Sequence, residues 1–209
     1  MVSREFQTNE LTSILKSCRR LSHILEIGQL YSVFADVVKE SFGIRELAVF
    51  EYYKSEKKLS LVSSIGLGHL NLQIPRSKSS LWKSILKGEP FEVSDDSGKP
   101  LFSEDFQKST LAGLQSKLWV PVGIGHELTG LLTIGGRENN QPFNEADRYF
   151  LQQLSAHAAV CINTCRLYEK HQQEKEDLDK TLQNLSLLYS IGKAISKPGL
   201  RYEKLDQLT

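Results

Sequence analysis

Residues 117–134 read Lys-Leu-Trp-Val-Pro-Val-Gly-Ile-Gly-His-Glu-Leu-Thr-Gly-Leu-Leu-Thr-Ile, and this stretch indicates the fold class. Two runs rich in apolar residues, Lys117–Ile124 and Leu128–Ile134, flank the short segment Gly125-His126-Glu127. This pattern predicts two antiparallel strands joined by a tight turn, and the glycine pair that follows ends the second strand. We therefore expect a β-hairpin here.

Further elements are predicted on both sides of this hairpin. Apolar periodicity predicts a helix over residues 10–41 that Gly28 bends or interrupts, strands over 47–53 and 59–65, a helix over 79–87 and a brief strand over 91–93. Residues 94–116 form a mixed segment, and a loop of this length in a compact domain is usually functional or mobile. A long helix begins at Asn144, a suitable N-cap, and meets no clear breaker before Pro198. The fold class is therefore α+β, with a mainly antiparallel sheet of five or six strands.

The long helix carries two apolar seams whose residues step by four and three, the period of coiled coils. A wholly polar stretch, Lys170–Lys175, separates the two seams. One small domain cannot cover so long a helix, so we expect a coiled-coil connector that pairs with a second copy of the chain. The residues expected in this homodimer are Leu154, Ala158, Cys161, Cys165, Tyr168, Leu178, Leu182 and Leu185.

Residues 21–32, LSHILEIGQLYS, return in altered form at residues 185–196 as LSLLYSIGKAIS. The spacing suits one whole domain rather than a solenoid repeat. We therefore expect an N-terminal helical extension over 1–20, a first domain over 21–168, a helical linker over 169–184 and the start of a second domain over 185–209. The closing Asp-Gln-Leu-Thr also resembles the opening of a diguanylate cyclase domain, which leaves two interpretations of that second domain open.

The order and local sequences of these elements resemble a GAF domain, a sensory module of signalling proteins. Leu118–Val122 and Leu128–Ile134 match the family's central hairpin, Phe143–Asp147 matches its F-x-x-x-D helix opening, and Ile27-Gly28 matches its first helix. The resemblance implies terminal helices on one face of the sheet, a ligand pocket on the other, and a dimer built through the helices. It does not fix the ligand, because GAF domains bind cyclic nucleotides, haem, bilins, amino acids, metal centres or nothing measurable.

A cyclic nucleotide, cAMP or cGMP, is the ligand that we favour on this resemblance. The expected binding residues combine hydrogen-bonding groups for a purine or ribose with aromatic rings that cover a base. They are Ser64, Phe102, Asp105, Phe106, Ser109, Thr110 and Trp119. The alternative, that the aromatic residues only fill a core, stays open.

Family members that bind cyclic nucleotides carry an N-K-F-D-E-type constellation, which is largely structural. Here Asn139 or Asn140, Phe143 and Asp147 are present, the Lys is missing, and Arg148 replaces the Glu. The partial match therefore says little about binding.

The positions of cysteine and histidine argue against other cofactors. No cysteine lies between Cys18 and Cys161, where covalent bilin attachment and GAF-type methionine sulfoxide reduction would need one. His69 and His126 are candidates for haem iron, but turn histidines that face solvent are the commoner case. Cys161 and Cys165, one helical turn apart, suit packing better than a metal site.

Composition excludes several classes of function. The net charge of +1 offers no field for nucleic acid, and no apolar run approaches the length of a membrane-spanning helix. The start of the chain lacks the apolar stretch of a secretion signal, and the three cysteines cannot all pair, which indicates the cytoplasm. No nucleophile elbow, Walker sequence or His-Glu-x-x-His motif is present, so we expect no catalysis by this chain.

These observations lead to two hypotheses. In the first, the chain is a non-catalytic sensory module whose ligand shifts the loop between residues 98 and 116 and so controls a C-terminal output domain through a dimeric helical connector. In the second, it is a ligandless dimerisation scaffold of a signalling protein such as a diguanylate cyclase or a histidine kinase.

Overall fold

The computed structural model describes residues 2–68, 72–94, 99–102, 114, 116–125 and 127–195. The chain divides into two compact units, Met1–Arg166 and Leu167–Thr209. The first unit contains the whole sheet, and the second contains the C-terminal part of the last helix.

One antiparallel sheet forms the centre of the first unit. Its six strands are β1 (Leu47–Tyr53), β2 (Lys58–Ile65), β3 (Gln73–Pro75), β4 (Phe91–Glu92), β5 (Leu118–Ile124) and β6 (Glu127–Ile134). Their spatial order is β3-β2-β1-β6-β5-β4, and every pairing is antiparallel. The two edge strands are the shortest, which limits the unpaired backbone that the sheet exposes. The predicted sheet of five or six antiparallel strands is confirmed.

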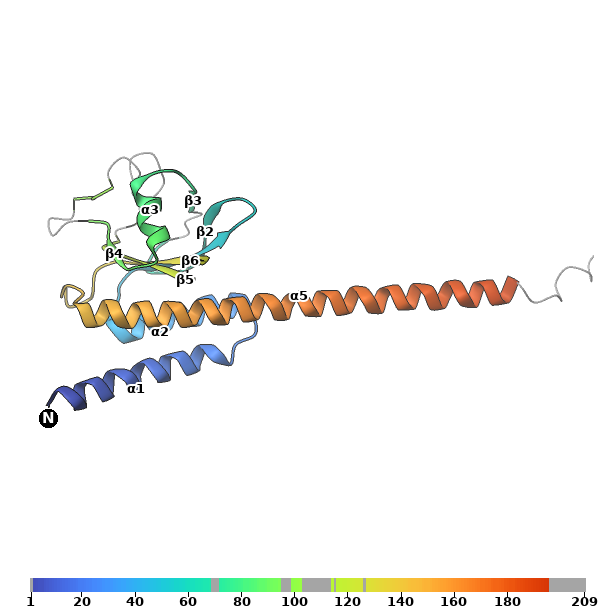
Figure 1. The fold of residues 1–209 in the computed structure, drawn as a ribbon, viewed down its shortest axis with the longest axis horizontal. Helices are drawn as coiled ribbons and strands as arrows, with labels where there is room; N and C mark the ends of the chain where they lie inside the picture. Colours follow the sequence, from blue (N-terminus) through green and yellow to red (C-terminus); the bar gives the residue numbers. More distant parts are fainter. Residues whose placement is uncertain are drawn as a thin grey trace, which may run out of the picture. The chain divides into compact units, whose positions relative to one another are not determined.

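Helices lie on both faces of this sheet. Figure 1 shows α2 (Ile27–Phe42) and the first part of α5 (Glu145–Ile195) against one face, with α1 (Val2–Ser22) beside them. The short helix α3 (Ser80–Lys87) lies on the opposite face. The predicted packing of the N- and C-terminal helices on one face is therefore confirmed.

Strand residues alternate between the two faces, because successive side chains of a strand point in opposite directions. In β1, Leu47 and Val49 pack with the helices, whereas Ala48, Phe50 and Tyr52 belong to a second buried cluster. We call the side toward α2 and α5 the helical face and the other side the second face. The sheet thus separates two hydrophobic cores.

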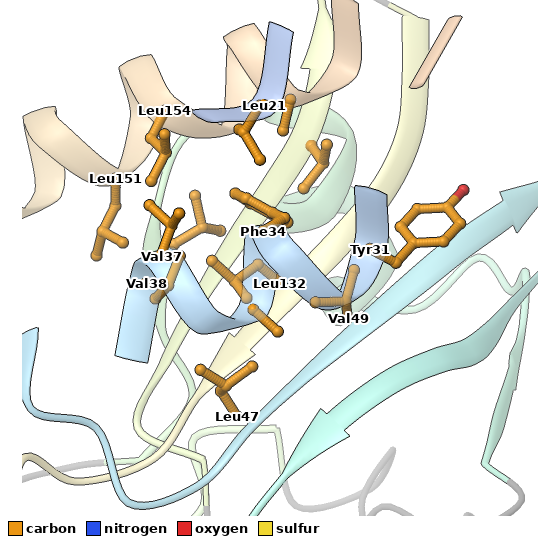
Figure 2. Close-up of a cluster of buried hydrophobic side chains, with 14 of the residues drawn as sticks. Leu21, Tyr31, Phe34, Val37, Val38, Leu47, Val49, Leu132, Leu151 and Leu154 are labelled. Carbon is orange, nitrogen blue, oxygen red and sulfur yellow. The ribbon is translucent and has the colours of Figure 1, made fainter. Parts of the chain in front are cut away.

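The core on the helical face joins all three long helices to the sheet. Figure 2 shows side chains of α1, α2 and α5 meeting residues of β1 and β6. Burial of each such aliphatic or aromatic side chain contributes about 1.5–3 kcal/mol. The labelled members with 1% exposure or less are Leu21, Phe34, Val37, Val38, Leu47, Val49, Leu132, Leu151 and Leu154.

Residues 10–41 form parts of two helices, where we predicted one helix that Gly28 bends or interrupts. The chain leaves the helical conformation at residues 23–26, just before Gly28. The thiol of Cys165 in α5 donates a hydrogen bond to the Ile24 carbonyl (3.3 Å), which ties this break to the core. The apolar spacing continues across the break, so periodicity alone does not reveal it.

The hairpin and α3 form as predicted. β5 and β6 pair from Leu118 opposite Ile134 to Ile124 opposite Glu127. The Ser79 hydroxyl caps α3 by accepting from the Trp82 amide at 3.4 Å. Strand β3 was not predicted, because three residues carry too little alternation to be recognised.

Helix α5 is continuous for 51 residues. The expected second domain over 185–209 overlaps α5 as far as Ile195 and otherwise lies outside the described residues, so it stays a prediction. No helix in the described part of the chain has a segment both long and apolar enough to cross a bilayer.

Candidate functional site

A row of paired residues crosses the second face of the sheet. Phe91 of β4 lies opposite Trp119 of β5, which lies opposite Thr133 of β6; Thr133 pairs with Ala48 of β1, and Ala48 with Ser64 of β2. Directly opposite residues of antiparallel strands point to the same face, so these side chains are neighbours. The row changes from two large rings to three small side chains, of which Ala48 and Thr133 are buried, and a small depression borders the row at Thr133.

Other side chains border this space. Leu67, Leu114 and Ser116 line a depression above Thr133 that measures about 150 Å³, the open solvent at its mouth included. Pockets for small molecules usually measure about 300–1,000 Å³. The depression that the described side chains form is smaller than such a pocket.

Trp119 is part of the core rather than of an open binding surface. Its side chain is completely buried, and its indole Nε1 donates to the Ser116 hydroxyl at 2.6 Å. Its ring lies 6.0 Å from that of Phe91, and Phe91 lies 5.9 Å from Phe102. Trp119 and the half-buried Phe102 thus belong to one aromatic stack, which in this arrangement fills space instead of covering a ligand.

The structure describes three of the seven predicted ligand-binding residues. Ser64 is half-buried in the cross-sheet row, and Phe102 and Trp119 belong to the aromatic stack. Four predicted residues and both histidines considered for haem lie outside the described residues: Asp105, Phe106, Ser109, Thr110, His69 and His126.

A second cluster of polar residues lies at the start of α5. The Asn144 side chain accepts from the Asp147 amide, and the Asp147 carboxylate accepts from the Asn144 amide, both at 2.8 Å. This reciprocal pair forms a capping box that satisfies backbone donors of the first turn. The same carboxylate forms an ion pair of 2.7 Å with Arg137, and both side chains are largely shielded from solvent.

Arg137 is the residue of this cluster that sequence reasoning missed. Its guanidinium lies 4.7 Å from the centre of the Phe143 ring and 5.4 Å from that of Phe42. It supplies the cation that the N-K-F-D-E-type pattern lacks in the sequence, while Arg148 pairs with Glu92 of β4. The sequence signal for this residue was a basic side chain directly after the glycine pair that ends β6. Its pairing with Asp147 becomes visible only in the folded chain. The constellation therefore joins the end of the sheet to α5.

The predicted dimer residues of α5 fall into two groups. Four of them point into the core of the first unit and are at most 8% exposed: Leu154, Ala158, Cys161 and Cys165. Their burial within the chain leaves them little surface for contact with a second copy, and their place in a dimer stays a prediction. The other four are 44–59% exposed: Tyr168, Leu178, Leu182 and Leu185.

All three cysteines lie on the helical face. The Cys161 sulfur is 3.6 Å from His157 Nε2, which is also 3.1 Å from the Cys18 carbonyl oxygen. Burial raises the pKa of the Cys18 and Cys161 thiols, which keeps both protonated and unreactive. In the part of the chain that the structure describes, no three thiol, imidazole or carboxylate groups are placed to share a metal ion. These cysteines and His157 serve to pack α1 on α5.

The comparison with known families agrees with this fold. The family model described as "GAF domain" matches residues 26–162, which is more than half of the chain. The chain therefore belongs to the GAF domain family. GAF domains are sensory and regulatory modules of signalling proteins and are generally non-catalytic.

Solved structures share the fold at low sequence identity. The GAF domain of a phosphoenolpyruvate-protein phosphotransferase from Coxiella burnetii is 17% identical, with 78% of this chain and 98% of that chain covered and a TM-score of 0.61. Residues 122 to 287 of a methyl-accepting chemotaxis protein are 17% identical, with 73% and 98% covered and a TM-score of 0.59. A bacteriophytochrome from R. palustris is 11% identical, with 83% and 41% covered and a TM-score of 0.60. At these identities the likeness concerns the fold.

Proposed function

We propose that this chain is the sensory module of a signalling protein and binds a small ligand on the second face of its sheet. The observation that carries the proposal is the row of small side chains, Ser64, Ala48 and Thr133, at the sheet centre. Large side chains in the same row would fill this space, as Trp119 does beside it. Ser64 and Ser116 add hydroxyl groups for a polar ligand.

A cyclic nucleotide, cAMP or cGMP, is the first ligand to test. The predicted partners Asp105, Ser109 and Thr110 supply polar groups, and Phe106 supplies a ring, in the segment that follows Phe102. A purine would lie above Ala48 and Thr133, with its ribose or phosphate near Ser64.

Thermal unfolding with each nucleotide at millimolar concentration tests this ligand. Binding at a hundred times Kd adds about 2.7 kcal/mol, so Tm should rise by roughly 5–10 °C for a chain of this size. Ser64→Leu fills the floor and should abolish the rise, whereas Ser60→Leu, on the same strand, should keep it. Absence of any shift with either nucleotide would remove cyclic nucleotides from the proposal.

The second part of the proposal concerns α5, which we take to connect this module to an output domain in a homodimer. The second unit carries a series of exposed apolar side chains, and isolated helices do not leave so many leucines in water. They are Tyr168, Leu178, Leu182, Leu185, Leu188 and Tyr189, each at least 44% exposed. A second copy of the same helix covers them most simply.

Sedimentation equilibrium tests the dimer. The wild-type chain should self-associate, and Leu182→Asp, which places a charge in the seam, should shift the equilibrium to monomer. Lys180→Asp, two residues away and outside the seam, is the matched control. A wild-type chain that is still monomeric at about 100 μM would contradict the dimer.

A ligandless dimerisation scaffold is the second candidate function, and the burial of Trp119 favours it. With its ring covered and its indole N–H bonded to Ser116, this residue needs no ligand to be satisfied. This candidate predicts dimerisation without any ligand-induced change in Tm, so a rise in Tm with either nucleotide would exclude it.

A further inference from the structure

Two well-shielded ion pairs hold α5 to the rest of the first unit, one near each end of the part that belongs to that unit, besides the more exposed pair of Arg148 with Glu92. Asp147 pairs with Arg137 at 2.7 Å, with side chains 17% and 12% exposed. Arg166 pairs with Glu51 of β1 at 2.5 Å, with side chains 35% and 12% exposed. Each other ion pair among the described residues has a side chain at least 49% exposed. These two contacts are thus the ones best shielded from water and salt.

The pair near the start of α5 is held by several further contacts. The Asp147 carboxylate also accepts from the Asn144 amide, and the Arg137 guanidinium lies over Phe143 and Phe42. Loss of any one contact leaves the others in place. This end of α5 is therefore a fixed anchor.

The pair near the end of the unit depends on fewer contacts. Arg166 is the last residue of the first unit, and its guanidinium donates to Glu51 Oε1. The second carboxylate oxygen of Glu51 accepts from the Tyr53 hydroxyl at 3.0 Å, within the same strand. One ion pair thus connects the strand to the helix at this point.

A buried hydroxyl beside this ion pair makes no hydrogen bond of normal geometry. Tyr31 of α2 is 4% exposed, and its hydroxyl lies at the edge of the core, turned away from the labelled aliphatic side chains (Figure 2). Burial raises the pKa of this hydroxyl first, and the nearby Glu51 charge raises it further. A buried unpaired hydroxyl costs free energy that a small movement of Glu51 or Arg166 would recover. A second arrangement, in which Glu51 or Arg166 bonds to the Tyr31 hydroxyl, is therefore also favourable.

Strand β1 links this ion pair to the second face. Phe50 and Tyr52 point into the core of the second face, and Glu51 between them points to α5. Phe50 and Tyr52 are the immediate neighbours of Glu51, so we expect a displacement of either one to move Glu51 as well.

From these contacts we propose that Glu51 and Arg166 form a releasable clamp through which β1 controls the last turn of α5 in the first unit, while Arg137 and Asp147 keep the start of α5 fixed. Opening the clamp loosens that turn, which Cys165 still holds through its buried side chain and its hydrogen bond to the Ile24 carbonyl, and exchanges the Glu51 contact with Arg166 for one with Tyr31. The signalling meaning of this clamp rests on the connector role proposed above for α5.

Hydrogen exchange of the full chain tests the clamp. Glu51→Gln removes the charge and keeps the shape, and Arg166→Gln removes the other partner, so either variant suffices if the other folds poorly. Amides of residues 160–166 should then exchange about ten- to a hundredfold faster, while those of residues 145–152 keep their wild-type rates. Glu92→Gln, which breaks the exposed pair with Arg148 on the same helix, should change neither region.

A charge exchange separates a clamp from general stabilisation. Glu51→Arg combined with Arg166→Glu should restore slow exchange at residues 160–166. Unchanged exchange there in both single variants, equal acceleration at residues 145–152, or no restoration by the exchange variant would each overturn the proposal. The exchange rates test the clamp whether or not the chain dimerises. Self-association of the same variants tests the connector role of α5 separately.

Discussion

Arg137 shows how one side chain can join two elements that local sequence signals treat separately. It combines an ion pair with Asp147 and contacts over two aromatic rings, in a place where both charged side chains are largely shielded. Such an arrangement is costly to break, because removal of one partner leaves the other charge without compensation.

We expect Arg137→Met to lower the free energy of unfolding by about 2–4 kcal/mol, because Asp147 then loses its cation in a shielded place. Arg148→Met is the matched control, since its partner Glu92 is half exposed and such pairs contribute about 0–1 kcal/mol. Urea unfolding followed by circular dichroism measures both values. Equal losses in the two variants would show that shielding does not distinguish the pairs.

Tyr31 leads to a prediction about alkaline pH. Its folded-state pKa lies above the value of about 10 expected in the unfolded chain, so the folded protein holds this proton more tightly. The contribution to stability is complete below pH 10 and is lost as pH rises above 10, by up to about 1.4 kcal/mol per pH unit.

Tyr31→Phe should therefore lose less stability than the wild type between pH 9 and 11. At pH 7 it should be as stable or more stable by about 1 kcal/mol, because the unpaired hydroxyl is gone. Urea midpoints over this pH range measure the effect. Tyr189→Phe, with an exposed ring, is the control, and parallel pH profiles for Tyr31→Phe and wild type would contradict the prediction.

At the scale of elements, α5 has two different roles along its length. In the first unit one side of the helix faces the sheet, and the apolar residues of that side are buried in the core on the helical face. In the second unit the apolar residues are exposed. The same four-and-three spacing therefore serves an intramolecular core in one part and a proposed dimer in the other.

A pair of alanine substitutions distinguishes these roles. Leu154→Ala should lower the free energy of unfolding by about 2–5 kcal/mol, as for other buried leucines. Leu182→Ala should leave the melting of the first unit unchanged and weaken self-association instead. Scanning calorimetry and sedimentation measure the two effects, and a large stability loss in Leu182→Ala would contradict the division.

The sheet shows a similar dependence on one position. Gly130 of β6 lies opposite Glu51, and a Cβ atom there would come within 2.3 Å of the Phe50 carbonyl oxygen. A glycine is therefore required at this point of the β1–β6 pairing, opposite Glu51 of the proposed clamp. Gly130 thus has a packing role in the hairpin that the turn pattern does not reveal.

At the scale of the whole chain, the first unit contains the complete sheet and both hydrophobic cores. A chain that ends at Arg166 should therefore fold with a cooperative transition of its own and remain monomeric. Circular dichroism melting and light scattering after gel filtration measure the two properties. A truncated chain that still dimerises would place the dimer contacts in the first unit instead.

Local signals predicted most of the fold. The hairpin, α3 with its Ser79 cap, and the start of α5 at Asn144 each depend on residues close together in sequence, whose propensities and caps act before any tertiary contact. The candidate site was less predictable. Ser64 and Trp119 both lie in the cross-sheet row, Trp119 fully buried, and their part in binding a ligand stays a prediction.

Residue patterns alone were enough to predict the alternation that divides the strands between two faces, the order of elements typical of GAF domains, and the long final helix. The folded chain was needed to see which side of α5 faces the sheet, that Arg137 reaches Asp147, and that Glu51 meets Arg166. The physical reason is that periodicity records which residues of an element avoid water, while the partner that covers them lies far away in the chain. A seam of leucines and cysteines looks the same whether a sheet or a second helix buries it.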